Sequence, residues 1–163
     1  MSAVDKKLQM FEEAGGRAAI EKVTEAFYDR VYADPWLSQF FDGIPRSHIQ
    51  AQQDDFMQAA LGGRRGYSGK TPPSAHQHIY ITEEMFEVRQ AHLMSAFREC
   101  HASERMVEMW LAIEDAFRGR LTKDSISDCV MRYPAEGIRN YPKPLGYWYL
   151  TVSVAHPMGG TMD

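Results

Sequence analysis

Two histidines stand one residue apart in the stretch PPSAHQHIYITEEMFEV, which begins at Pro72. Imidazole is the commonest metal ligand among protein side chains, so His76 and His78 are candidates for that chemistry. The double proline favours a short turn or helix just before them. Residues two apart on a helix point in very different directions. One histidine can therefore face an interior while the other faces water.

Two polar side chains interrupt apolar helix faces elsewhere in the chain. Gln53 lies four residues after Ile49 and three before Phe56, inside an apolar stripe. Tyr28 stands beside Phe27 on the inner side of an earlier segment. A buried polar group without a partner costs about 1–3 kcal/mol. Two such groups aimed into one interior indicate a ligand that accepts hydrogen bonds. Alternatively, Tyr28 and Gln53 bond each other or nearby backbone.

Segments with a helical period must hold these side chains. Apolar residues recur every three or four positions from 17 to 33, which predicts a helix there. The pair Gly15-Gly16 separates it from a short first segment, and Asp34-Pro35 ends it and begins a short helix through WLSQFF. Ser47 is a plausible cap for a further helix that runs to Leu61.

Two longer helices follow the loop GGRRGYSGKTPP. Thr82, followed by two glutamates, marks the start of one, and Ser103-Glu104 begins the other. The expected inner faces carry mostly large apolar residues: Phe86, Leu93, Ala96 and Phe97 on the first, and Met106, Trp110, Ile113 and Phe117 on the second. No run before residue 125 has the pattern of a strand, so the predicted fold class is all-α.

The composition limits the class of protein. A chain of 163 residues fits one domain that can bury a core, and 25% charged with 44% apolar residues is typical of a globular protein. A net charge of −4 argues against a nucleic-acid or anionic membrane surface. The two cysteines, Cys100 and Cys129, form no CxxC motif, and no apolar run suits a signal peptide or a bilayer span. We expect a cytoplasmic protein.

The composition changes near residue 125. Proline, glycine and tyrosine are frequent from there on, and YWYLTVSV has strand-like content but no obvious partner strand. We therefore divide the chain into one domain at residues 1–124 and a C-terminal extension at 125–163. The extension is expected to be an irregular arm rather than an independent domain, and its role is open.

The order of these elements resembles the truncated haemoglobins, the two-over-two branch of the globins. The features that match are EEAGG, AFYDRVYADPWLSQFF, QQDDFMQAALGG, YSGK, and AHQHIYITEEMF leading into AHLMSAF. The resemblance covers about Leu8 to Leu121, and the spacing around AFYDRV, LGG and AHQ fits group I best. It implies a truncated globin fold, a 2-on-2 helical sandwich around haem, followed here by the irregular arm.

The resemblance implies haem b as the cofactor, with His76 of the AHQ motif as the iron ligand. Such a ligand needs its other ring nitrogen held by a hydrogen bond. His78 would then point away, toward the porphyrin edge or solvent. His48 is the rival ligand, because it adjoins the distal helix. The other histidines, His92, His101 and His156, are interpreted as structural or surface residues.

The same resemblance matches Tyr28 and Gln53 to the distal pair that holds the bound ligand. Dioxygen in such a pocket carries partial negative charge, which hydrogen-bond donors stabilise. The other residues implied at the cofactor are Phe41, Ile49, Lys70, Ala75, Ile79, Phe86, Met109 and Ile113, with Arg64 and Arg65 as further contacts for the haem propionates. Core packing explains the apolar ones equally well, and a solvated loop explains each charge.

Arg89 departs from the family pattern. It follows Phe86 by three residues, where relatives usually carry an apolar side chain. A buried guanidinium without a partner is unfavourable, so we expect Arg89 to pair with a haem propionate or to swing outward, away from the distal ligand. The extension is also longer than the family norm.

The resemblance implies reversible binding of dioxygen or another diatomic ligand, such as nitric oxide or carbon monoxide, at a five-coordinate iron. An enzyme is the alternative: a nitric oxide dioxygenase that forms nitrate and depends on a reductase. A haem-based redox or gas sensor that signals through the arm is the third possibility. No nucleic acid and no membrane span are expected in any of the three.

Overall fold

Helices make up the regular structure of the described chain. The computed structural model describes residues 1–63 and 66–147. Within these ranges there is no strand, only an isolated bridge between Ile79 and Arg139. The helices are α1 (Ala3–Glu13), α2 (Gly16–Ala33), α3 (Arg46–Ala60), α4 (Pro72–Ala75), α5 (Glu83–Glu99) and α6 (Glu104–Leu121), with the 3-10 turns η1 (Leu37–Phe41) and η2 (Ile126–Asp128). The all-α prediction is confirmed, and none of these helices is long and apolar enough to cross a bilayer.

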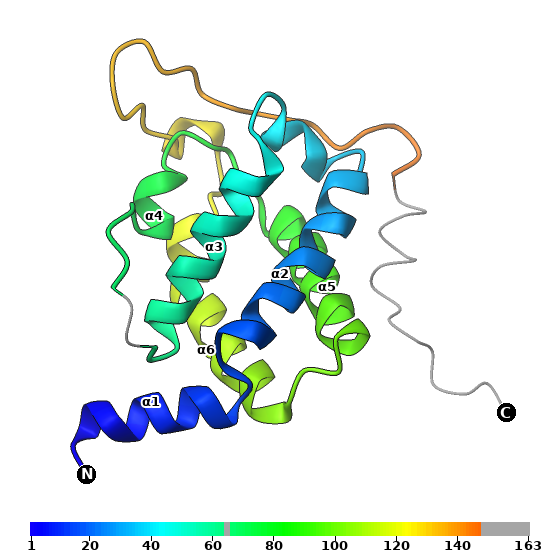
Figure 1. Ribbon diagram of the computed structural model, residues 1–163. Helices are drawn as coiled ribbons and strands as arrows, with labels where there is room; N and C mark the ends of the chain where they lie inside the picture. Colours follow the sequence, from blue (N-terminus) through cyan, green and yellow to red (C-terminus); the bar gives the residue numbers. More distant parts are fainter. Residues whose placement is uncertain (64–65, 148–163) are drawn as a thin grey trace, which may run out of the picture.

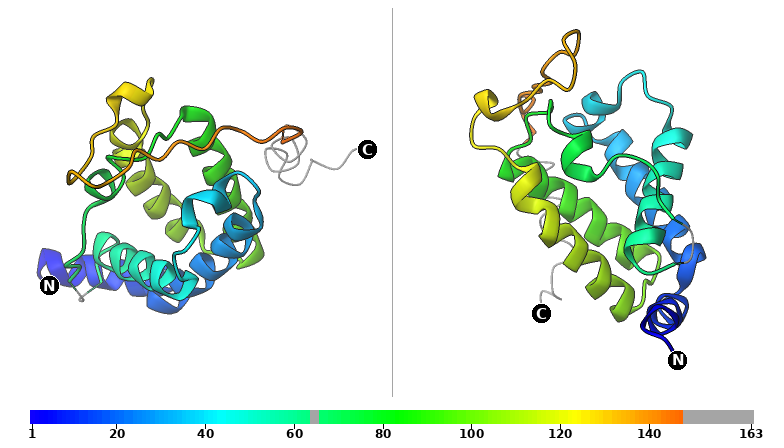
Figure 2. Two further views of the ribbon diagram at one scale, coloured as in Figure 1. Left: turned by 90° about the horizontal axis from the view of Figure 1, so that it is seen from above. Right: turned by 90° about the vertical axis from the view of Figure 1, so that its left-hand side faces the viewer.

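Four helices form two layers. The pair α2 and α3 lies on one side, and the pair α5 and α6 runs alongside on the other (Figures 1 and 2). Helix α2 packs against both α3 and α5. The rings of Phe56 and Phe117, with centroids 6.0 Å apart, join α3 to α6. This is the two-over-two sandwich that the sequence predicted.

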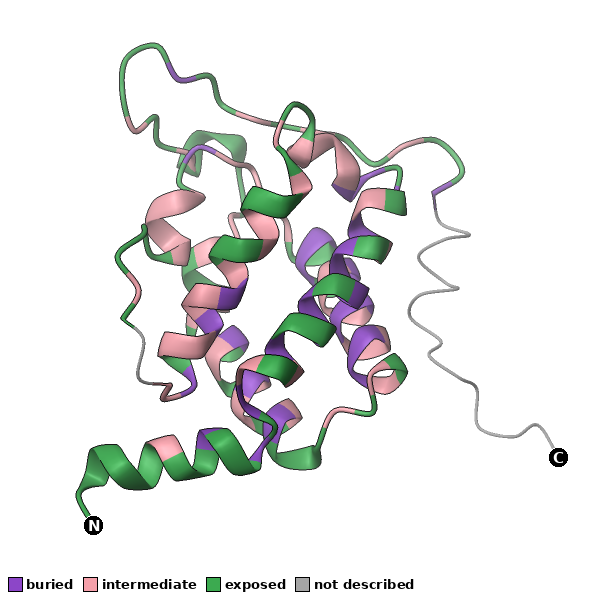
Figure 3. Ribbon diagram, in the orientation of Figure 1, coloured by how far each residue is buried: buried purple, intermediate pink, exposed green. Residues whose placement is uncertain are grey.

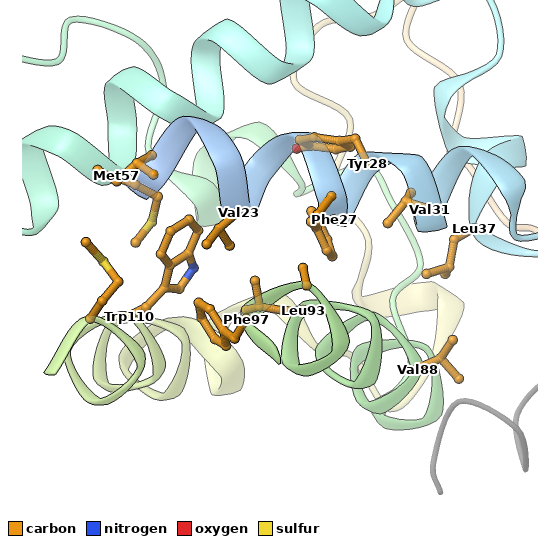
Figure 4. Packing of buried hydrophobic residues seen from close by; sticks show 14 of the residues in the cluster. Val23, Phe27, Tyr28, Val31, Leu37, Met57, Val88, Leu93, Phe97 and Trp110 are labelled. Carbon is orange, nitrogen blue, oxygen red and sulfur yellow. The ribbon is translucent and has the colours of Figure 1, made fainter. Parts of the chain in front are cut away.

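Most of the buried apolar side chains belong to α2 and α5. Ile20, Val23, Phe27 and Val31 are buried on α2, as the apolar period predicted. Of these, Val23 and Phe27 point toward α5 and α6 (Figure 4). Helices α3 and α4 differ, because most of their inward residues are only half-buried (Figure 3). Asp54 and Met57 are the buried residues of α3, and α4 has none. The inner sides of α3 and α4 are therefore less enclosed than those of α2 and α5.

The helix starts follow the predicted capping residues in two cases out of three. The hydroxyls of Thr82 and Ser103 accept the backbone N–H groups of Met85 and Met106, which fixes where α5 and α6 begin. The prediction of Ser47 as a cap was wrong. Pro45 occupies that position and α3 begins at Arg46, because the fixed φ of proline already holds the extended entry that a cap requires.

The two glycine pairs turn the chain at positions where a side chain would be strained. Gly15 has φ of +121° and Gly62 has φ of +100°. A Cβ on Gly62 would also meet the backbone and Cβ of Lys7 at 3.2 Å. The second pair therefore permits α1 to lie close against the end of α3.

Residues 125–147 of the extension pack along the helical body. They leave the end of α6 and cross toward the start of η1 and α5 (Figure 1). Trp36 donates from Nε1 to the carbonyl of Tyr141 at 2.6 Å, and the Phe40 and Tyr141 rings lie 4.6 Å apart. The strand-like stretch YWYLTVSV, apart from Tyr147, lies outside the described residues.

Candidate functional site

The histidine of the AHQ motif follows directly on the short helix α4. The helix starts with Pro72 and ends at Ala75, so the backbone turns at His76. The Nδ1 atom of His76 lies 2.6 Å from the carbonyl oxygen of Pro72. A carbonyl only accepts, so this ring nitrogen carries the proton and donates it. The other nitrogen, Nε2, is then unprotonated and has a free lone pair.

The surroundings of His76 keep its imidazole neutral. Burial lowers the pKa of His76 most, and the nearby positive charges of Arg89 and Lys123 lower it further, against the opposite effect of the Pro72 carbonyl. Within residues 1–63 and 66–147, Nε2 has no hydrogen-bond partner. Lys123 donates to the carbonyl of His76 at 3.1 Å, which holds the backbone of this turn. A neutral imidazole that is held in one orientation and has an unprotonated nitrogen is able to bind a metal ion.

His78 does not point to solvent, which was one of the two orientations predicted for it. Its side chain is buried, and its Nε2 lies 3.4 Å from Oε1 of Glu136 in the extension. Its Nδ1 has no partner within the described chain. The solvent-facing alternative was wrong because the extension, which could not be placed from the sequence, covers this side of the turn.

Residues 125–147 of the extension form a clasp, which is hydrogen-bonded to the segment that carries His76. The amide of Val130 donates to the carbonyl of Gln77 at 2.9 Å, and the amide of Arg139 donates to that of His78 at 2.8 Å. Arg139 accepts in return from the Tyr80 amide at 2.9 Å. These backbone hydrogen bonds join residues 77–80 to Val130 and Arg139 of the extension. The extension therefore supports the turn that carries His76.

A salt bridge inside the extension reinforces this clasp. Arg132 donates from Nε to Glu136 at 2.7 Å, and its Nη1 reaches the carbonyl of Ala75 at 3.4 Å. Arg132 lowers the pKa of Glu136 to about 2, chiefly through this hydrogen bond. The carboxylate that faces His78 is therefore charged at neutral pH.

Tyr28 leaves α2 on a different side from Phe27, which points toward α5 (Figure 4). Its ring packs edge-on against Phe27 at 5.0 Å and Phe41 at 6.0 Å. Burial raises the pKa of the Tyr28 hydroxyl, so it remains a donor. Within residues 1–63 and 66–147, neither this hydroxyl nor the Gln53 amide makes a hydrogen bond. The alternative in which the two satisfy each other or nearby backbone is not seen in this structure.

The other predicted contact residues are distributed between wall, core and surface. Phe86 is fully buried, and Lys70 is exposed on its loop. Arg64 and Arg65 lie outside the described residues. His48 and His101 are exposed, whereas His92 is buried and bonded to Asp34 at 2.7 Å. The half-buried residues that pack at the edge of the core or beside the turn at His76 are Phe41, Ile49, Ala75, Ile79, Met109 and Ile113.

The sequence as a whole now places the chain in a known group. A sequence model of the bacterial-like globin family matches residues 9–122. The chain belongs to the bacterial-like globin family. Residues 125–147, which form the clasp, lie beyond the matched region of this globin.

Relatives of known identity agree with this assignment. The globin is 39% identical over 87 residues to the group 1 truncated hemoglobin GlbN of Mycolicibacterium paratuberculosis, which covers 53% of this chain and 64% of that one. The match thus spans slightly less than two thirds of that relative. It is 29% identical over 102 residues to the group 1 truncated hemoglobin of Tetrahymena thermophila, covering 63% of this chain and 84% of the relative.

Solved structures have the same fold. The 2/2 hemoglobin of Synechococcus sp. PCC 7002, a cyanomet form with covalently attached heme, superposes with a TM-score of 0.61. It is 27% identical and the match covers 68% of the globin and 94% of that chain. The Fe(III) truncated hemoglobin of Tetrahymena pyriformis is 24% identical and superposes with a TM-score of 0.63. That match covers 71% of the globin and 98% of the Tetrahymena chain. The predicted truncated globin fold is confirmed.

Membership of this family implies a globin that binds haem and a small ligand on it. The residues present fit haem iron. Among the described residues no group of three His, Cys, Asp or Glu side chains could hold a bare metal ion. His76 offers one oriented nitrogen, which is what an iron already held by a porphyrin takes from a globin. A surface hollow of about 310 Å³ beside the clasp, lined by Pro73, Gln77 and Lys123 among others, contains none of the predicted site residues.

Arg89 also forms a charged pair that the sequence did not predict. Arg89 on α5 donates from Nη1 to Oε2 of Glu114 on α6 at 2.6 Å. Arg89 therefore does not swing outward, because the carboxylate offsets the cost of burying its charge. Glu114 could have been noticed in the sequence, since it lies four residues after Trp110 and three before Phe117 on an otherwise apolar face.

Proposed function

We propose that this globin binds haem b through His76 and holds dioxygen or another diatomic ligand on the opposite, distal side. Haem, when bound, supplies the iron atom to which the small ligand attaches. The residues of the chain orient the cofactor, keep water out and stabilise charge on the ligand.

The orientation of His76 carries the proposal. Its Nδ1 is fixed 2.6 Å from the Pro72 carbonyl, so the lone pair of Nε2 has one direction. Burial keeps the pKa of His76 below its usual value, and protons therefore compete weakly for that lone pair near neutral pH. Histidines that bind a metal commonly donate their other ring N–H to a backbone carbonyl in this way.

The residues on the distal side favour an iron whose sixth coordination position is left open for the small ligand. His48 is exposed, and Ile49 supplies an apolar, half-buried side chain beside it. The Tyr28 hydroxyl and the Gln53 amide are donors without protein acceptors among the described residues. Both can donate to a ligand that carries partial negative charge, and such bonds strengthen in a dry pocket.

The test is to reconstitute the purified protein with haem and record its absorption spectrum. We expect one haem per chain, a Soret band, a five-coordinate ferrous form, and reversible shifts on addition of dioxygen and carbon monoxide. A protein that takes up no haem, or whose ferrous form is six-coordinate through a second histidine, would contradict the proposal. Extraction of the cofactor into acidified butanone separates haem b, which is extractable, from a covalently attached haem.

A further inference from the structure

The Arg89–Glu114 ion pair lies in a largely buried position, where removing charge from water is unfavourable. Glu114 is only 7% exposed, on an α6 face that is otherwise apolar. Burial by itself lowers the pKa of the Arg89 guanidinium, but the Glu114 carboxylate overrides that effect and the net pKa is raised. Arg89 therefore stays charged. A buried ion pair contributes little to stability compared with apolar residues of the same volume, so its presence calls for another explanation.

The two partners are not equally enclosed. The Arg89 side chain retains 30% of its accessible surface, whereas that of Glu114 retains 7%. A guanidinium has five N–H donors. Within residues 1–63 and 66–147, Arg89 makes one hydrogen bond, and its acceptor is Glu114. The Glu114 carboxylate is therefore buried, whereas the Arg89 guanidinium is partly exposed and has N–H donors that no described residue accepts.

The Arg89 guanidinium lies beside two aromatic rings, and one of them belongs to Phe86, a predicted haem contact. The guanidinium carbon lies 5.2 Å from the centre of the Phe27 ring and 5.9 Å from that of Phe86. The Phe27 ring in turn packs against Tyr28 at 5.0 Å. The positive charge of Arg89 also acts on the Tyr28 hydroxyl and on the His76 imidazole, which are the predicted distal and proximal groups. Arg89 thus lies against the rings of Phe27 and Phe86, and one ring away from Tyr28.

We propose that Arg89 is an anion-recognising group of the ligand pocket, held in position by Glu114, and that it favours small monovalent inorganic anions on the iron over neutral ligands. This rests on the proposed haem site. Guanidinium donors form charge-assisted hydrogen bonds, which are about twice as strong as neutral ones. A neutral ligand gains much less from the same cation. Glu114 is a positioning residue, because it touches Arg89 and not the ligand.

The probes are azide as the anion and imidazole as the neutral ligand, titrated into the haem-loaded ferric protein near pH 7.5. Arg89→Met should weaken azide binding by roughly ten- to a hundredfold and change imidazole binding less than about threefold. Glu114→Gln keeps an acceptor for Arg89 and removes the opposing charge, so it should tighten azide binding.

Arg118 provides a matched control. Its guanidinium lies 4.9 Å from the same Phe86 ring, but it pairs with Glu83 on the surface at 2.7 Å. Arg118→Met removes the same charge and should leave azide affinity unchanged. If Arg89→Met alone folds poorly because it strands Glu114, the double variant Arg89→Met/Glu114→Gln removes both charges and should show the same loss of azide affinity.

Three results would overturn the inference, and they are distinguishable. A haem-loaded Arg89→Met or double variant with wild-type azide affinity would refute the role of Arg89 and leave the haem proposal intact. An equal loss of azide and imidazole affinity would reduce Arg89 to a structural residue. A wild-type protein that takes up no haem would remove the proposed function and this inference with it.

Discussion

The phenol of Tyr147 donates a hydrogen bond to the carboxylate of Asp34, so the extension is tied to the C-terminal end of α2. The same carboxylate accepts from His92 and, through its other oxygen, from the amides of Trp36 and Leu37. Burial tends to raise the pKa of Asp34, but these hydrogen bonds together lower it below its ordinary value. Asp34 therefore connects α2, η1, α5 and the extension as an ionised group.

Tyr147→Phe should lower the free energy of unfolding by about 1–3 kcal/mol near neutral pH, because it removes a hydrogen bond to a charged acceptor. Asp34 has a depressed folded pKa, so its stabilisation is present above the unfolded value of about 3.9 and is lost as pH falls through the folded value. The difference between variant and wild type should shrink in that acidic window. Urea titrations from pH 7 to about pH 3 measure it, with the exposed Tyr133→Phe as control. A difference that does not depend on pH would mean that Asp34 is not the relevant acceptor.

Arg132→Met should speed haem loss by roughly three- to tenfold, because it removes the bridge between Glu136 and the carbonyl of Ala75. Haem transfer to excess apomyoglobin gives the rate. Lys143→Met is the matched control, since Lys143 pairs with Glu84 at the surface, away from the proximal turn. Equal rates in the two variants would show that the clasp does not support the cofactor side.

Tyr28→Phe should speed dioxygen release by roughly five- to a hundredfold, since a hydrogen bond of about 1–3 kcal/mol to a partly charged acceptor is lost. Gln53→Leu should act in the same direction but less, and the double variant should be less than additive because both donors share one network. Bound carbon monoxide is less polar, so its release should change far less. Flash photolysis and ligand replacement measure both gases, and equal effects on the two would indicate a wider pocket instead of lost donors.

The helices were predictable because their signals are local. The apolar period of α2 and the hydroxyl caps at Thr82 and Ser103 depend on residues within one or two turns, and the structure has them. Ser47 failed as a cap for a local reason too, since Pro45 sets an extended entry one residue before α3. The candidate ligand His76 was found by resemblance, and the structure adds the Pro72 carbonyl that orients it.

The environments of His78 and Arg89 could not be predicted, because their partners are distant in the sequence. Glu136 reaches His78 through an extension without a periodic pattern, and Glu114 reaches Arg89 across two helices. A desolvated charge requires a partner, but the sequence does not say which one. For Arg89 the need for a partner was evident and its identity was not, whereas for His78 the burial itself was not expected.

The central claim, that His76 is the proximal ligand, is tested most directly by the ferrous absorption spectrum of His76→Gly with and without added imidazole, beside that of His78→Ala. We expect His76→Gly to bind haem weakly and to regain a five-coordinate globin spectrum when imidazole fills the space of the lost side chain. We expect a nearly unchanged spectrum for His78→Ala, whose imidazole faces Glu136. The reverse pattern, a normal spectrum for His76→Gly and a lost one for His78→Ala, would contradict the account.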